Sequence, residues 1–502
     1  NVGESSITGR QMVRADDFAY LMDGEKIFAV NRDDHAKASQ EKQKGFLKAR
    51  EVRRDPKKSA EAKEMMQQYM KVGIIWQHAS DFDDVLIASD NLVIAGGLNE
   101  VIAIDRKTGE QRWQHSVDGN VRGLAFDENV LIVSTDTGNI YAFGSDTSPE
   151  QVVNWPLPLS APYPDDELTS VYKSAAAQIL ERSGQRTGYC LVLGSEQGRL
   201  AYELAQQSEL TVYAVEPDAK KAAASRQALD RAGLHATRIT VVSAPMNELP
   251  FSNYFANLIV SDSMLLTGQL PGDPEKISRY LKPCGGVVIL GRPDEGPVEQ
   301  SAASADQTVQ WLARFNQKDE GEVITGRSWN MLRRGKLAGA GNWSHQYGNV
   351  ANTSYADDHR IRDGLGVLWY GDPGPSSMIN RHEAAGAPLS TNGRMFIQGT
   401  DRLMAYDAYN GTFLWDYANP GAIRTGVFNN RETHNLAASD DVLYAAVNHQ
   451  CIALDAATGQ VAATYQTPES SDGIERAWAY LAYDDGQLFG TSTIREELEQ
   501  RM

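Results

Sequence analysis

A short segment recurs three times in this chain, and it constrains the fold more than any other sequence feature. Each copy has alternating apolar residues, an aspartate, a turn with a glycine and a second apolar stretch. The copies read V-I-A-I-D-R-K-T-G-E-Q-R-W at 101–113, L-M-A-Y-D-A-Y-N-G-T-F-L-W at 403–415 and C-I-A-L-D-A-A-T-G-Q-V-A-A at 451–463. The alternation predicts a half-buried strand, the aspartate caps a tight turn, and the glycine supplies the positive φ of that turn. Each copy is therefore predicted to be a β-hairpin.

Further strand-like segments extend each hairpin into a larger repeat. Trp113 and Trp415 follow four residues after the glycine, where an indole ring can pack between adjacent sheets, whereas the third copy has Ala463 there. Alternating apolar stretches precede the hairpins, and weaker copies of the repeat occur at 17–31 and 130–144. Four strands per repeat form one blade of a β-propeller, and we expect five or six such blades in this chain.

The repeats resemble those of pyrroloquinoline-quinone proteins over residues 13–145 and 335–502. They are similar to the blades of quinoprotein dehydrogenases and of the propeller lipoprotein of outer-membrane assembly. The resemblance implies a periplasmic or cell-envelope protein that binds or scaffolds another protein or a small molecule. A quinone-dependent oxidoreductase is one alternative, but pyrroloquinoline quinone is not expected. The dehydrogenases often place adjacent cysteines beside it, and the three cysteines here are Cys190, Cys284 and Cys451.

Composition excludes several other classes of protein. A net charge of −18 and a pI near 5.0 argue against nucleic-acid partners, because phosphates would be repelled. Three cysteines without a C-x-x-C pair indicate neither a disulfide framework nor a zinc site, and we assign no metal. No apolar run reaches the ~18 residues of a transmembrane helix. Because the chain begins at Asn1 and ends just after a strand-like stretch, we expect a fragment of a longer protein.

A charged segment at 34–71 interrupts the first repeat. Its content of Ala, Glu, Lys and Gln, with a break at Pro56, predicts a helical hairpin that projects from the propeller. Such a segment is either a solvated surface or a docking arm.

A second type of pattern begins after Phe143, where strands alternate with helical stretches as in a parallel sheet with crossovers. The segment 189–205 reads as a strand, a glycine turn and a helix start. Gly194 and Gly198 flank Glu196 in that turn, and the next strand ends in Glu216, whose carboxylate can accept hydrogen bonds from ribose hydroxyls. A nicotinamide-type fingerprint fails, because Glu196 and Arg199 stand where it needs glycine.

The order of these elements resembles a class I S-adenosylmethionine-dependent methyltransferase over about 120 residues. The resemblance implies a Rossmann-like, doubly wound parallel sheet and an adenosyl site formed by Gly194, Glu196, Gly198, Glu216 and Asp262. Three other positions depart from the family pattern at Val192, Pro245 and Asn257, and Glu196 places a charge where the methionine carboxylate of the ligand would lie. S-Adenosylmethionine is therefore a candidate cofactor, and either a scaffold without methyl transfer or a working methyltransferase fits the pattern.

Polar loops between the later repeats provide a second group of candidate site residues. They contain Arg381, His382, Arg424, Asn430, Arg431, His434 and Asn435, which could converge at one mouth of the propeller. Hydrogen bonding between blades is the alternative role. Trp343 and Tyr347 are expected to pack, and His345 receives no metal role because no second ligand has suitable spacing.

The sequence thus predicts a multidomain protein of β and α/β type. Blades at 1–147 and 331–502 would form one β-propeller, interrupted by a methyltransferase-like domain at 148–330. The predicted function is binding or scaffolding in the cell envelope. The alternatives are an active methyltransferase whose propeller selects the substrate and a quinone-dependent oxidoreductase.

Overall fold

The computed structural model describes residues 9–51, 72–144, 160–293, 302–371, 378, 386–420 and 435–494, except positions 83, 128, 317–319, 363, 400 and 470. The chain divides into two compact units, Asn1–Asn154 and Trp155–Met502. We describe each unit by itself.

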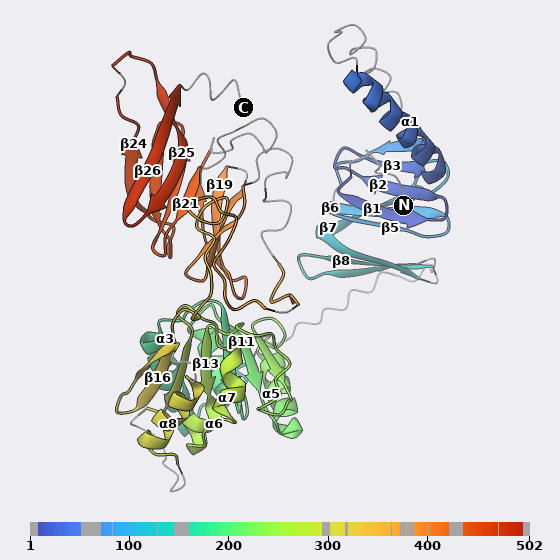
Figure 1. The fold of residues 1–502 in the computed structure, drawn as a ribbon. Coiled ribbons are helices and arrows are strands. Elements are labelled where there is room, and N and C mark those ends of the chain that lie inside the picture. Colours follow the sequence, from blue (N-terminus) through green and yellow to red (C-terminus); the bar gives the residue numbers. More distant parts are fainter. Residues whose placement is uncertain are drawn as a thin grey trace. The chain divides into compact units, whose positions relative to one another are not determined.

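The first unit contains two antiparallel sheets (Figure 1). The first sheet has four strands in chain order, β1 (Gln11–Ala15), β2 (Phe18–Met22), β3 (Lys26–Asn31) and β4 (Ile74–Ala79). The second has five, β5 (Val85–Ala88), β6 (Leu92–Asp105), β7 (Gln111–Asp127), β8 (Val130–Thr135) and β9 (Ile140–Phe143). Register shifts at Leu98/Glu100 in β6 and at Val121/Gly123 in β7 divide these long strands into two halves.

Helix α1 (Arg32–Glu51) follows β3 directly, inside the hairpin that β4 completes. It covers the first part of the segment 34–71, for which the sequence predicts a helical hairpin, and residues 52–71 lie outside the described residues. Asp33 and Asp34 lie in its first turn, where their negative charges interact favourably with the positive end of the helix dipole.

The second unit begins with a seven-stranded sheet in the order β12-β11-β10-β13-β14-β16-β15. The strands are β10 (Tyr189–Leu193), β11 (Thr211–Val215), β12 (Ile239–Val242), β13 (Leu258–Ser261), β14 (Val287–Gly291), β15 (Gly321–Ile324) and β16 (Trp329–Arg334). The first five are parallel, and β16 runs antiparallel to both β14 and β15. The expected doubly wound sheet is therefore present, and it ends in an antiparallel hairpin.

Helices cover both faces of this sheet (Figure 1). They are α3 (Glu167–Ser183), α4 (Arg199–Gln206), α5 (Ala219–Arg231), α6 (Asp262–Thr267), α7 (Pro274–Ile277) and α8 (Ala305–Phe315). The first three pack in one apolar cluster, and α7 and α8 pack in another on the opposite face. Alternate residues of β10 contribute to the two clusters, as expected for a strand that is buried on both faces.

The second unit continues with repeats of the type seen in the first. One four-stranded sheet has β17 (Leu389–Thr391), β18 (Arg394–Gly399), β19 (Arg402–Asp407) and β20 (Phe413–Ala418). Another has β21 (Leu436–Ala438), β22 (Val442–Val447), β23 (Gln450–Asp455) and β24 (Val461–Gln466). A two-stranded sheet of β25 (Arg476–Asp484) and β26 (Gln487–Ile494) follows. The predicted four-stranded antiparallel repeat is confirmed in β1–β4, β17–β20 and β21–β24.

Tryptophans connect successive repeats in one geometry. The indole N–H donates to a backbone carbonyl in the turn of the following repeat in the pairs Trp76 to Arg106, Trp369 to Ala408 and Trp415 to Ala456, at 3.0, 3.1 and 3.1 Å. The ring lies against the turn glycine, so that a Cβ added at Gly109, Gly411 or Gly459 would approach ring atoms to 2.7, 2.4 and 2.6 Å. The expected packing of Trp415 between sheets is confirmed, and Trp113 packs edge-on against Phe143 of β9.

Candidate functional site: the glycine loop of the α/β domain

The loop between β10 and α4 has the backbone shape that the sequence predicts. Gly194, Glu196 and Gly198 all have positive φ, at 58°, 51° and 82°. A Cβ at Gly194 would lie 2.6 Å from the Ser263 hydroxyl oxygen, and one at Gly198 would lie 3.0 Å from the Tyr163 hydroxyl oxygen. Both glycines are therefore required by the packing of the protein itself. Glu196 adopts a left-handed conformation that is costly for a residue with a Cβ.

Glu216 attaches this loop to the carboxyl end of β11. It lies just after β11 and is only 4% exposed. One carboxylate oxygen accepts the backbone N–H of Glu196 at 2.7 Å, and the other accepts that of Asp218 at 3.0 Å. A carboxylate has about four acceptor positions, so two remain for a ligand. The predicted ribose acceptor is therefore held by the loop that would surround the ligand.

The side chain of Glu196 is also paired within the protein. Its carboxylate forms an ion pair with the ammonium group of Lys221 on α5, and this contact raises the pKa of Lys221. The Ser225 hydroxyl donates to the Glu196 carbonyl at 3.0 Å. Glu196 thus joins the loop to α5 through both its backbone and its side chain.

Asp262 lies at the carboxyl end of β13 and is completely buried. The Tyr172 hydroxyl donates to one carboxyl oxygen at 2.8 Å, and the other oxygen has no partner among the described residues. Burial raises the pKa of Asp262 to about 8. The Ser195 hydroxyl is likewise buried without a described partner. Asp262, which the resemblance places in the adenosyl site, and Ser195 are thus both fully buried in this structure.

A cluster that the sequence analysis missed covers the start of α4. Arg199 makes two hydrogen bonds of 2.7 Å to the carboxylate of Asp166, which is also the N-cap of α3. The Arg199 guanidinium lies over the ring of Tyr163, whose hydroxyl donates to the Gln197 carbonyl at 2.7 Å. The arginine contact lowers the pKa of Asp166 to about 2. The capping signal of Asp166 was visible in the sequence, but its second partner 33 residues later was not.

The sheet β17–β20 contacts the amino ends of strands in the parallel sheet. Asn257, just before β13, accepts the Tyr189 N–H at 3.0 Å and the Asn410 side-chain amide at 2.8 Å. The same Asn410 amide donates to the Phe255 carbonyl at 2.8 Å. Lys282, which precedes β14, forms a buried ion pair with Asp407. These contacts lie at the amino ends of the strands, whereas the glycine loop, Glu216 and Asp262 lie at the carboxyl ends.

Comparison with known families identifies the repeats. The family of outer membrane protein assembly factor BamB, a PQQ family, matches residues 59–151 and 354–498. The strands β4–β9 and β17–β26 lie within the matched residues, and these segments are PQQ-type repeats. No curated protein matches the chain as a whole or in part.

Solved methyltransferase structures are similar to part of the chain. A SAM-dependent methyltransferase from Aquifex aeolicus is 16% identical, with 34% of this chain and 93% of that chain covered and a TM-score of 0.27. A TehB-like SAM-dependent methyltransferase from Corynebacterium glutamicum is also 16% identical, with 32% and 87% covered and a TM-score of 0.24. The glycopeptide N-methyltransferase MtfA in complex with sinefungin is 18% identical, with 33% and 94% covered and a TM-score of 0.25.

The predicted mouth residues lie in loops between the PQQ-type repeats, and the described residues include one of them, Asn435. Arg381, His382, Arg424, Asn430, Arg431 and His434 lie outside the described residues. Asn435 is buried, and its side-chain amide donates to the Gln398 side chain at 3.1 Å, which is a contact between two repeats.

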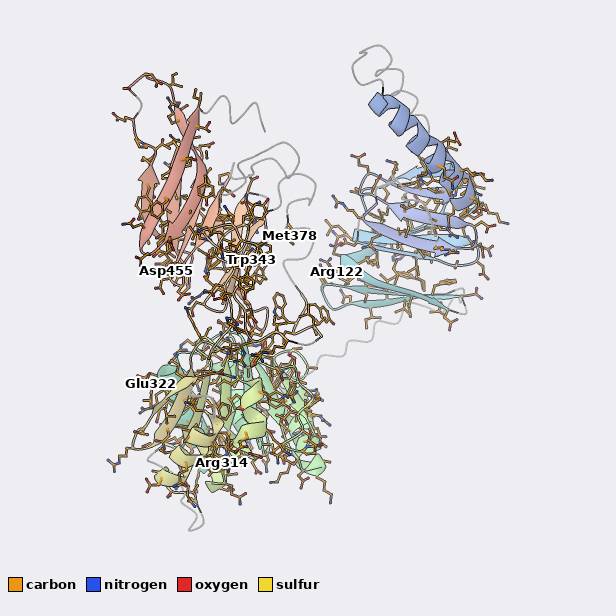
Figure 2. All side chains as sticks on the ribbon, in the orientation of Figure 1. Arg122, Arg314, Glu322, Trp343, Met378 and Asp455 are labelled. Atoms are coloured by element: carbon orange, nitrogen blue, oxygen red, sulfur yellow. The ribbon has the colours of Figure 1, made fainter. Side chains whose placement is uncertain are left out.

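The segment that precedes the second group of PQQ-type repeats has a structural role. Trp343, labelled in Figure 2, forms an isolated β-bridge with Ser390 of β17, and its ring packs against the apolar cluster of β17–β24. His345 is buried, bridges to Ala437 and accepts the Tyr483 N–H at 3.1 Å. Tyr347, which was expected to pack as well, is 46% exposed.

Two further searches of the described residues give negative results. No described helix is long and apolar enough to span a membrane. Within the same residues, no group of three His, Cys, Asp or Glu side chains is placed to hold a metal ion.

Proposed function

We propose that this chain is a binding or scaffolding protein of the cell envelope whose PQQ-type repeats form one β-propeller. In this proposal the partner is another protein or a small molecule, and the α/β domain serves as a structural domain without methyl transfer. The envelope location is supported by the match to the family of an outer membrane protein assembly factor. The structural role is supported by the pairing of Glu216 and Glu196 within the protein. It is also supported by the contacts of β17–β20 with the amino ends of the parallel strands.

The observation that carries the structural role is the pairing of Glu216 and Glu196. Both oxygens of Glu216 accept N–H groups of the protein, and Glu196 pairs with Lys221 across the loop. An adenosylmethionine ligand would bring its own carboxylate toward Glu196 and would have to displace this arrangement. Like-charge repulsion and the loss of the ion pair both oppose that step.

The position of the blades supports the same proposal. The contacts of β17–β20 lie at the amino ends of β13 and β14, so this sheet is on the far side from the glycine loop. A four-residue strand such as β13 separates its two ends by roughly 13 Å. A substrate held by β17–β20 would therefore not reach a methyl donor at the loop, which argues against substrate selection by that sheet.

An active methyltransferase remains the second candidate, and one observation favours it. Glu216 keeps two unused acceptor positions, and the buried Ser195 hydroxyl and Asp262 carboxyl oxygen have no described partners. Rearrangement of the loop would give a ligand access to these groups.

Calorimetric titration with S-adenosylmethionine and S-adenosylhomocysteine separates the two candidates. We expect no binding heat from the parent chain at millimolar ligand, and measurable binding after Glu196→Gly, which removes both the charge and the left-handed strain. Lys221→Met is the matched control, because it breaks the same ion pair but leaves the Glu196 carboxylate in place. Micromolar binding by the parent chain would overturn the structural role and support the enzyme.

A further inference from the structure

A cavity of about 220 Å³ lies within the α/β domain, beside α7, the end of α8 and the hairpin β15–β16. The residues that line it include two carboxylates, two guanidinium groups and two aromatic rings. These are Glu275, Glu320, Arg279, Arg334, Tyr254 and Phe315. The cavity therefore combines charged groups with apolar walls, as small-molecule sites do.

The cavity lies at the amino ends of the parallel strands. Tyr254 precedes β13, Arg279 precedes β14, and Arg334 is the last residue of β16, which runs antiparallel to β14. The glycine loop and Glu216 lie at the carboxyl ends instead. Because ligands of doubly wound sheets bind at the carboxyl ends, this cavity is distinct from the adenosyl site that the resemblance implies.

The two carboxylates of the lining are already paired within the protein. One oxygen of Glu320 contacts Arg334 and the other contacts Arg360, both at 3.0 Å, and this side chain is only 5% exposed. Glu275 pairs with Arg314 of α8 at 3.3 Å. These ion pairs offset the negative charge of the lining, so the cavity is not built for a cation.

Arg279 differs from the other charged residues of the lining. No described residue forms an ion pair or a hydrogen bond with its guanidinium group. The guanidinium lies over the ring of Tyr280, 5.0 Å from the ring centroid, and this contact restricts its position. A planar guanidinium with unused N–H groups is suited to bidentate binding of a carboxylate.

Tyr254 has a strained backbone conformation at this cavity. Its φ is 62°, in the left-handed region, which is costly for a residue with a Cβ and rare for a bulky one. Its N–H donates to the Arg279 carbonyl at 2.8 Å, and its ring lies 5.3 Å from the Arg334 guanidinium. Among the described residues, none hydrogen-bonds with its hydroxyl group. Strained residues of this kind collect at ligand sites, where surrounding contacts hold them in place.

We propose that this cavity binds a small organic carboxylate that carries one planar ring. Arg279 holds the carboxylate, and the rings of Tyr254 and Phe315 contact the ring of the ligand. A cavity of about 150 Å³ is large enough for benzene, so about 220 Å³ suits one ring with its carboxylate. Helix α8 ends at Phe315, and the negative end of its dipole disfavours a dianion such as phosphate.

The bound carboxylate would lie next to the contact that attaches the sheet β17–β20. Tyr254 packs edge-on against Tyr409 of the repeat turn, with ring centroids 5.6 Å apart. The ligand would therefore stabilise a residue that connects the α/β domain with that turn. This inference goes beyond the proposed function and holds whether or not the glycine loop binds an adenosyl ligand.

Ligand-observed fluorine NMR on the full chain tests the charge requirement. The probes are para-fluorobenzoate and para-fluorobenzyl alcohol, its neutral analogue. We expect saturable binding of the carboxylate, at least about tenfold tighter than that of the alcohol, because charge-assisted hydrogen bonds are the stronger ones. Arg279→Gln should weaken binding of the carboxylate by about tenfold and leave binding of the alcohol unchanged.

Arg231→Gln is the matched control for net charge. Arg231 is exposed at the end of α5, which packs on the opposite face of the sheet from α7 and α8. This variant should bind para-fluorobenzoate as the parent chain does. Equal affinity of the parent and Arg279→Gln for the carboxylate would overturn the inference, and so would the absence of saturable binding at millimolar probe.

Photolabelling with para-azidobenzoate locates the probe in the chain. We expect label in peptides that cover 251–282 and 312–334, and we expect para-fluorobenzoate to suppress it. Saturating S-adenosylhomocysteine should leave this labelling unchanged. Label confined to 189–218 would place the probe at the glycine loop and overturn the cavity as its site. The calorimetric titration with adenosyl ligands tests the proposed function separately, because it reports on the opposite end of the sheet.

Discussion

Lys282 of the α/β domain and Asp407 of β19 form a buried ion pair, with side chains 10% and 3% exposed. Asp407 also accepts the N–H groups of Tyr409 and Asn410 in the repeat turn, at 2.9 and 3.3 Å. One carboxylate therefore stabilises a hairpin and attaches it to the neighbouring domain.

Removing the lysine should destabilise the second unit strongly. Lys282→Met leaves the Asp407 charge buried and unpaired, and we expect a loss of about 3–5 kcal/mol in the free energy of unfolding. The double variant Lys282→Met/Asp407→Asn should recover part of this loss, since the asparagine oxygen still accepts the turn N–H groups. Urea unfolding followed by tryptophan fluorescence measures these changes. Asp455→Asn, at the corresponding turn (Figure 2), is the control and should cost under about 1 kcal/mol. A loss in Lys282→Met no larger than this would show that the pair does not hold the two parts together.

The contact between Trp415 and Gly459 should make this glycine more sensitive than other turn glycines. Gly459 has φ 71°, and an added Cβ would lie 2.6 Å from the indole ring. Gly473 has φ 69° with nothing within 4 Å, so Gly473→Ala measures the backbone cost alone, about 1–2 kcal/mol. We expect Gly459→Ala to cost at least ~1 kcal/mol more, from displacement of the ring. Equal losses of unfolding free energy would mean that the ring moves aside freely.

Any adenosyl binding gained by Glu196→Gly should depend on Glu216. Adding Glu216→Ala should weaken that binding by about 1–3 kcal/mol, because charge-assisted hydrogen bonds to the ribose are lost. Glu216→Gln is the control for loop structure, since its amide oxygen can still accept one loop N–H. Titration calorimetry on the two double variants measures the difference. Unchanged affinity in both would place the ligand elsewhere.

The stability of the α/β domain should fall as the pH rises from about 4 to about 8. The pKa of Asp262 is raised to about 8 in the folded protein from an ordinary value of 3.8, so the folded state binds more protons between these values. Ionisation of the unfolded chain then favours unfolding progressively until the folded carboxyl also ionises. Asp262→Asn, which mimics the neutral acid, should remove this component of the pH dependence. Urea midpoints at pH 5 and pH 8 for both proteins measure it, and parallel changes in the two would contradict the assignment to Asp262.

The sequence predicted the repeat hairpins well, because their signals are local. Alternation, a turn aspartate and a glycine with positive φ lie within one short segment, and Gly109, Gly411 and Gly459 all adopt that φ. The tryptophan contact with the next repeat was predictable for Trp415. It was not predictable for Trp369, which lies in a segment without a recognisable hairpin of its own.

The candidate site was only partly predictable. The glycine spacing located the loop, and strand order located Glu216 beside it. The pairing of Glu196 with Lys221, and of Arg199 with Asp166 and Tyr163, depends on helices brought together by the fold. Sequence spacing carries no signal for such contacts, because the partners are separated by 25 or more residues.

The three turn aspartates show what the sequence by itself determined and what only the tertiary structure decided. The local pattern determined that Asp105, Asp407 and Asp455 each accept backbone N–H groups in a hairpin turn. Asp105 also pairs with Arg112 of the same hairpin, whereas only the fold decided that Asp407 pairs with the buried Lys282. A turn needs groups a few residues apart, so its sequence specifies it. A buried ion pair needs two groups 125 residues apart to be desolvated together, and only the packing of the α/β domain against β17–β20 achieves this.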